Sequence, residues 1–182
     1  MNHLPRTRAQ GFTLMEVLVA LVIISIGLLG IAAMQATAIA STHTAQTESL
    51  AAIEARSLAD AMQANPDYWA GALMPATINV TGTAAAPVLS DTTLNSQATD
   101  CSSTPCTSAQ PSAMAGYDLQ QWAKQLFTQI PGSHAAINCV IGSPSICSIT
   151  VTWTQKSTAA VNSGTTSSTT PTTMTYTLVN QL

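Results

Sequence analysis

The chain has 182 residues, of which only 7% are charged, and its formal net charge at neutral pH is -3. A typical soluble domain has about 25% charged residues. The weak acidic balance excludes the clustered basic face that nucleic-acid binding requires, so no nucleic-acid partner is expected. Aromatic residues make up 4% of the chain, which leaves Ile, Leu, Val and Ala to build the core.

The first predicted element is an apolar helix over residues 12–34. At about 1.5 Å per residue it would span roughly 34 Å, enough to cross a hydrocarbon core of about 30 Å. Arg6 and Arg8 precede this segment, and no Lys or Arg follows until Arg56. The positive-inside rule therefore places the N-terminus in the cytoplasm and the rest of the chain outside, with a single pass through the membrane.

A secretory signal peptide is the competing interpretation of this segment. Small residues suited to its cleavage lie at Ala36-Thr37-Ala38 and Ala38-Ile39-Ala40. The apolar run is longer than the usual 7–15 residue core of such signals. One carboxylate, Glu16, also lies at its leading edge, which the signal-peptide interpretation does not explain.

Glu16 needs a partner of opposite charge. A carboxylate at the centre of a membrane helix costs about 2.5–3.5 kcal/mol on insertion scales. The apolar segment itself contains no Lys, Arg or His. Cleavage after Gly11 would give Phe12 a free α-amine four residues before Glu16, so a pair within the chain is geometrically possible.

The stretch "GFTLMEVLVALVII", residues 11–24, resembles the class III signal of type IV pilins and pseudopilins. The resemblance implies that residues 1–11 are a leader that a prepilin peptidase removes after Gly11. It implies that the same enzyme N-methylates Phe12. It also implies that Glu16 docks to the N-terminal amine of a neighbouring subunit, and that residues 12–34 anchor the chain in the inner membrane.

The helix is predicted to continue to residue 64, because no Pro interrupts it before Asn65-Pro66. Residues 35–64 form its amphipathic half, which we expect to pack against a globular periplasmic domain over residues 65–182. Two neighbouring stripes are available for this contact: Ile39, His43, Gln46, Leu50 and Ile53 on one, and Ala51, Ala55, Leu58 and Met62 on the other. We expect His43 to be a buried or half-buried structural residue.

The remaining elements predict an antiparallel sheet with one inserted helix. Residues 76–82 form a short strand, and residues 117–132 form the helix, whose apolar positions recur at helical spacing. These predicted core positions are Leu119, Trp122, Leu126, Phe127 and Ile130. Strands follow at 135–141, 148–155 and 174–182, with a low-complexity loop at 157–173 that we expect to be exposed and mobile. The fold class is α+β, a long N-terminal helix packed on an antiparallel sheet.

Four cysteines, an even number, follow an N-terminal apolar segment, which indicates an oxidising compartment and two disulfides. We predict the pairs Cys101–Cys106 and Cys139–Cys147, because each is local and flanks a turn. A zinc site is the alternative. The usual spacing of cysteine ligands occurs once at most, and no His lies at ligand spacing.

No catalytic motif is present. The sequence lacks a nucleophile elbow, a P-loop and the zinc-protease signature. Its histidines, at positions 3, 43 and 134, are far apart along the chain. We therefore expect a protein that is not an enzyme and that needs no cofactor or metal.

The stretch "DLQQWAKQLFTQIPG", followed by a Cys and a "VTW" strand, resembles the PilV-type minor pilins, the type IV pilus modification proteins. The resemblance implies a minor subunit that helps initiate or modify pilus assembly. Its implied partners are the major pilin, other minor pilins and a large tip adhesin, and it would be extracellular once in the pilus. A minor pseudopilin of a type II secretion system and a secreted soluble binding domain are the alternatives.

Overall fold

The computed structural model describes residues 11–71, 74–97, 99–102, 106, 110–156 and 171–182. The chain divides into two compact units, residues 1–42 and 43–182. Helix α1, Leu14–Ala64, begins in the first unit and ends in the second. The leader predicted at residues 1–11 lies outside the described residues except for Gly11, and so does most of the loop predicted at 157–173.

The first unit consists of the first half of α1. Thr13 caps this helix, since its hydroxyl accepts a hydrogen bond from the Glu16 amide at 3.3 Å. Thr13 and Glu16 thus have the spacing of a capping box, with the acid three residues after the cap. All large apolar side chains from Phe12 to Ile39 are exposed to solvent. The described part of this unit, residues 11–42, therefore has no apolar core of its own.

The second half of α1 belongs to the second unit, where it buries one stripe of side chains. These are Ala51, Glu54, Ala55, Leu58, Ala59 and Met62. The stripe predicted from Ala51 to Met62 is confirmed. The other predicted stripe is wrong in large part, because Ile39, His43 and Ile53 are exposed. The buried stripe therefore combines small alanines with the larger side chains of Leu58 and Met62.

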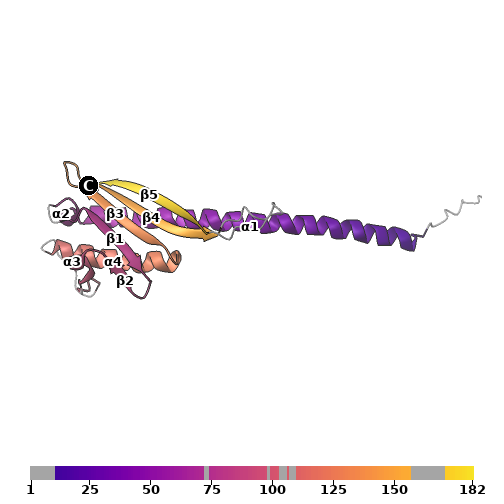
Figure 1. Ribbon diagram of the computed structural model, residues 1–182, viewed down its shortest axis with the longest axis horizontal. Helices are drawn as coiled ribbons and strands as arrows, with labels where there is room; N and C mark the ends of the chain where they lie inside the picture. Colours follow the sequence, from indigo (N-terminus) through magenta and orange to yellow (C-terminus); the bar gives the residue numbers. More distant parts are fainter. Residues whose placement is uncertain (1–10, 72–73, 98, 103–105, 107–109, 157–170) are drawn as a thin grey trace, which may run out of the picture. The chain divides into compact units, whose positions relative to one another are not determined.

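A five-stranded antiparallel sheet forms within the described residues, in the order β2-β1-β3-β4-β5 (Figure 1). Its strands are β1 Thr77–Gly82, β2 Pro87–Leu89, β3 His134–Val140, β4 Ile146–Lys156 and β5 Pro171–Gln181. The predicted α+β class is confirmed, and so are the four predicted strands. The sequence reasoning missed β2, and it assigned residues 171–173, the start of β5, to the loop.

Helix α4, Pro111–Gln129, is the predicted inserted helix and lies between β2 and β3 in the sequence. It starts six residues earlier than expected, with Pro111 in its first turn, where a missing amide hydrogen costs nothing. All five side chains that were predicted to form its core face are buried. The short helices α2, Pro66–Trp69, and α3, Thr92–Asn95, were not predicted.

Apolar side chains at alternate positions of the strands form the sheet side of the core of the second unit. Ile149, Val151 and Trp153 are buried on β4, as the alternating pattern predicted. On β5, buried Asn180 joins the sheet to α1, because its amide donates to the Ala59 carbonyl at 3.2 Å. The Gln63 amide donates to the Asn180 side-chain oxygen at 2.9 Å. The second half of α1 is thus fixed to the sheet by polar contacts as well as by apolar packing.

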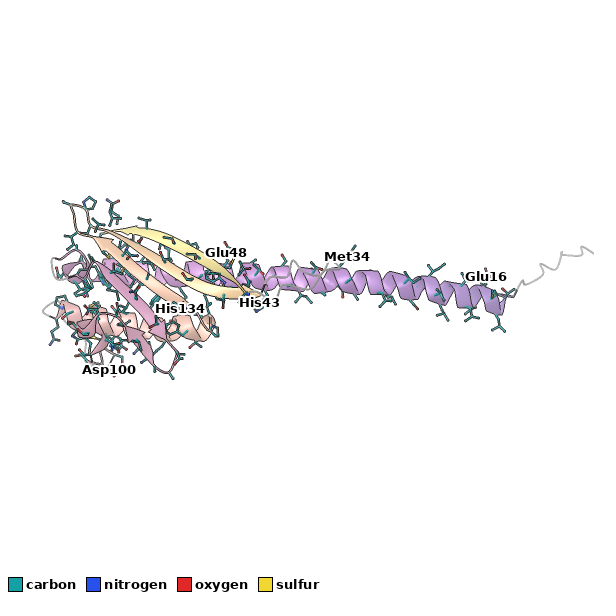
Figure 2. All side chains as sticks on the ribbon, viewed as in Figure 1. Glu16, Met34, His43, Glu48, Asp100 and His134 are labelled. Atoms are coloured by element: carbon teal, nitrogen blue, oxygen red, sulfur yellow. A yellow bond between two sulfur atoms is a disulfide. The ribbon has the colours of Figure 1, made fainter. Side chains whose placement is uncertain are left out.

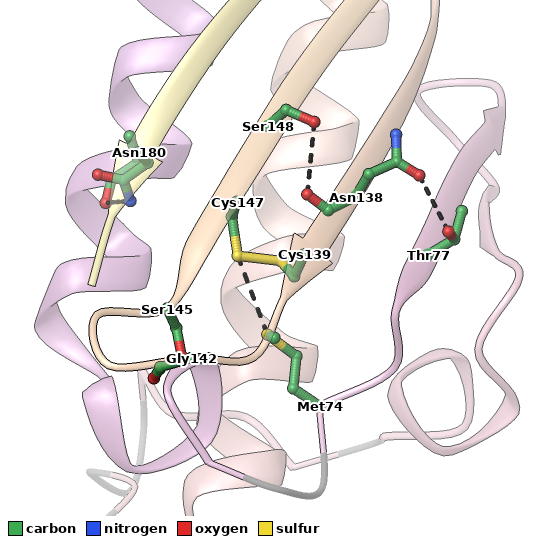
Figure 3. The surroundings of a disulfide bond; sticks show 10 residues. Met74, Thr77, Asn138, Cys139, Gly142, Ser145, Cys147, Ser148 and Asn180 are labelled. Atoms are coloured by element: carbon green, nitrogen blue, oxygen red, sulfur yellow. Dashed lines mark hydrogen bonds between the residues drawn. A yellow bond between two sulfur atoms is a disulfide. The ribbon is translucent and has the colours of Figure 1, made fainter.

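Both predicted disulfides are formed, and every described cysteine is paired. Cys139 and Cys147 are directly opposite each other on β3 and β4. The thioether of Met74 lies 3.9 Å from the Cys147 sulfur (Figure 3). Both cysteines are buried, so this disulfide is part of the core of the second unit.

Removal of the Cys139–Cys147 bond by a double alanine substitution is expected to lower the free energy of unfolding by about 2–3 kcal/mol through chain entropy alone. Urea titration of the full chain in detergent micelles, followed by tryptophan fluorescence, measures this loss. Trp69, Trp122 and Trp153 are all buried in the second unit and report its unfolding. The matched control is the Cys101→Ala/Cys106→Ala variant, whose cysteines are only half-buried. A loss below about 1 kcal/mol in the core variant would contradict the prediction.

Candidate functional site

Gly11, Phe12 and Thr13 form a short non-helical segment directly before α1. All three residues are exposed, and the Phe12 side chain is 82% exposed. A Cβ atom built on Gly11 would meet no heavy atom within 4 Å. The Gly11–Phe12 peptide bond is therefore accessible and outside regular structure, as a protease needs its target bond to be.

Glu16 lies in the first turn of α1 (Figure 2). Phe12 and Glu16 line one side of the helix together with Val17, Ala20, Leu21 and Ile24. Glu16 is the single ionisable side chain in this apolar lining. A carboxylate in the first turn is favoured by the partial positive charge of a helix N-terminus, an effect of about 0.3–1 kcal/mol. Glu16 therefore lies where the helix dipole favours a carboxylate. Its side chain is exposed, so a positive charge on another molecule can reach it.

Within the described residues, α1 is long and apolar enough to cross a membrane by length and composition. Two hydroxyl side chains in its first half bond to the backbone of the same helix. The Ser25 hydroxyl donates to the Leu21 carbonyl at 2.7 Å, and the Thr37 hydroxyl donates to the Ala33 carbonyl at 3.0 Å. Such bonds leave few polar hydrogens without a partner, which suits a helix in a medium without water.

The histidines, cysteines and acidic residues in the described part of the chain do not form a metal-binding cluster. No three His, Cys, Asp or Glu side chains gather there as possible metal ligands. The four cysteines are in disulfides and are not thiolate ligands. His43, expected to be buried or half-buried, is exposed, so that prediction is wrong. It lies on the α1 stripe that the globular core does not cover.

Sequence reasoning missed one buried acid, Glu54, which lies on α1 facing α4. Its side chain is fully buried, and its Oε1 atom accepts a hydrogen bond from the Gln129 amide at 2.6 Å. The Trp122 indole donates to the Glu54 carbonyl at 2.8 Å. Burial raises the pKa of Glu54, and an interaction with the Gln125 side chain opposes this rise. Its spacing from Ala51, Ala55 and Leu58 was the available signal, since those residues define the buried stripe.

An exposed non-helical segment at residues 11–13, a helix of membrane-spanning length and an antiparallel sheet define an α+β protein with a candidate membrane anchor. Residues 6–32 match the family described as prokaryotic N-terminal methylation motif. The match supports a type IV pilin-like protein, a class that is structural rather than catalytic. Comparison with curated proteins gives no match, and neither does comparison with solved structures.

Proposed function

We propose that this chain is a minor pilin, similar to the PilV type, that helps initiate or modify assembly of a type IV pilus. The observation that carries this proposal is the methylation motif on an apolar helix with exposed side chains. In this proposal, the leader is removed after Gly11 and Phe12 is methylated. The chain stays in the inner membrane with its second unit in the periplasm until it joins a filament.

The exposed first half of α1 supports a role in association rather than in catalysis. Its large apolar side chains from Val17 to Met34 need a cover, either lipid or the helices of other subunits. In a filament, helices of the major pilin and of other minor pilins would supply that cover. Glu16 would then pair with the N-terminal amine of a neighbour, because opposite charges share an apolar site stably only when they are paired.

A minor pseudopilin of a type II secretion system is the second candidate, because the same methylation motif supports it equally. The two candidates differ in the assembly that contains the mature chain. Recovery of the chain in a sheared pilus fraction, together with the major pilin, would favour the pilus. Its absence there, combined with a secretion defect on deletion of its gene, would favour the secretion system. A large tip adhesin is a further proposed partner in the first case.

The processed N-terminus tests the proposal most directly. We expect intact-mass and peptide mass spectrometry of the protein from its native membrane to find Phe12 as the first residue, carrying one methyl group. The same measurement in cells that lack prepilin peptidase activity should find the leader still attached. A mature terminus near Ser41 would contradict the proposal and would support a secreted soluble domain instead.

A further inference from the structure

A buried carboxyl group lies in the contact between α1 and α4. Glu54 has no exposed surface, and its Oε2 atom has no hydrogen-bond partner among the described residues. The other oxygen, Oε1, accepts the Gln129 amide hydrogen. An ionised carboxylate here would keep one charged oxygen out of water without a partner, which is costly. A protonated carboxyl group would avoid that cost because it carries no charge.

Among the described residues that interact with Glu54, none is basic. On α4 the residues that interact with Glu54 are Trp122, Gln125 and Gln129, which are not ionisable in the ordinary pH range. Asp118 precedes Trp122 by one helical turn and so lies on the same side of α4. Burial raises the pKa of Asp118 too. The ionisable groups on this side of α4 therefore add only negative charge.

On α1 the nearest charged residues in the sequence face solvent. Glu48, Arg56 and Asp60 are all exposed, and the Arg56 guanidinium lies 4.0 Å from the Asp60 carboxylate. The Arg56–Asp60 pair is thus directed away from the buried stripe that carries Glu54. On β5, Asn180 reaches α1 at Ala59, and it is uncharged.

We propose that the contact between α1 and α4 is a proton-dependent latch, in which protonation of Glu54 holds α4 against α1 and ionisation weakens that hold. The inference rests on the second unit alone and does not depend on the proposed function. A group whose pKa is raised on folding stabilises the folded state fully below its unfolded pKa. This stabilisation is lost as the pH rises through the folded pKa. The latch is therefore tighter at low pH and becomes looser as the pH rises through the folded-state pKa of Glu54.

Hydrogen exchange of α4 amides tests the latch in the full chain in detergent micelles. After correction for intrinsic exchange rates, we expect protection of residues 111–129 to fall between about pH 5 and about pH 8. The expected fall is roughly tenfold for each unit by which folding raises the Glu54 pKa. Wild-type protection that stays constant over this interval would overturn the proposal.

Three variants assign the effect to Glu54. Glu54→Gln keeps an acceptor for Gln129 but cannot ionise, so protection of α4 should become independent of pH. Asp60→Asn removes an exposed carboxylate from the same helix and should keep the wild-type dependence. Trp122→Phe removes the indole donor to the Glu54 carbonyl, and it should lower protection at both pH values while keeping the dependence. A pH dependence retained in Glu54→Gln would overturn the proposal.

Asp118→Asn provides a second test, which can be used even if the Glu54→Gln variant does not fold. If Glu54 is the titrating group, protection of α4 in Asp118→Asn should keep most of its pH dependence, because Asp118 is only partly buried. Loss of the dependence in Asp118→Asn would assign the titration to Asp118 and overturn the role of Glu54.

Discussion

Replacement of Glu16 by alanine is expected to leave the protein inserted in the membrane and cleaved after Gly11, but to reduce its co-purification with other pilin subunits by roughly tenfold or more. If Glu16 pairs with the N-terminal amine of a neighbouring subunit, as proposed, the substitution leaves that amine without its partner in an apolar surrounding. Uncompensated charge in a membrane helix costs about 2.5–3.5 kcal/mol at the centre. Each 1.4 kcal/mol corresponds to about tenfold in an equilibrium constant.

The capping geometry at the start of α1 gives Glu16 a second possible role, stabilising the start of the helix. The experiment must distinguish this role from pairing with a positive charge. Glu16 follows the Thr13 cap by three residues, where Glu and Gln both serve a capping box. Glu16→Gln therefore keeps the helix start and removes only the charge. If pairing matters, both variants should fail to assemble. Normal assembly of Glu16→Gln combined with failure of Glu16→Ala would assign the residue to helix capping. Normal assembly of both would contradict a role for Glu16 in docking.

Trp122→Ala is expected to lower the stability of the second unit by about 3–5 kcal/mol, from the deleted side chain and its cavity. The indole is 5% exposed and bonds the Glu54 carbonyl, so the variant also loses a hydrogen bond between α4 and α1. Whole-domain stabilities are only about 5–15 kcal/mol. We therefore expect the substitution to remove a large share of the stability of the second unit.

Urea unfolding followed by circular dichroism of the full chain in detergent measures this loss. Gln121→Ala, at the adjacent exposed position of the same helix, is the matched control and should change stability by no more than about 0.5 kcal/mol. A loss below about 1 kcal/mol in Trp122→Ala would contradict the packing of α4 against α1 described above.

Features that depend on neighbours in the sequence were predictable. The apolar run, the absence of Pro and the Asn65-Pro66 stop give the extent of α1 to within two residues at its start. Helical spacing on α4 and alternation on β4 and β5 identify the buried faces, because apolar side chains recur with the period of each element. The Cys101–Cys106 and Cys139–Cys147 pairs follow from short separations of 5 and 8 residues.

Features that depend on distant residues were decided by the tertiary structure. Two stripes on α1 had comparable apolar character, and only packing against α4 and the sheet selected the one with the alanines and left His43 exposed. The partners of Glu54 are 68 and 75 residues away on α4, and the Ala59–Asn180 bond spans 121 residues. The sequence by itself determined the N-terminal motif and the periodic faces, because both are local patterns. The environment of the buried acid was settled only when α1, α4 and β5 came together, because desolvation depends on which surfaces meet.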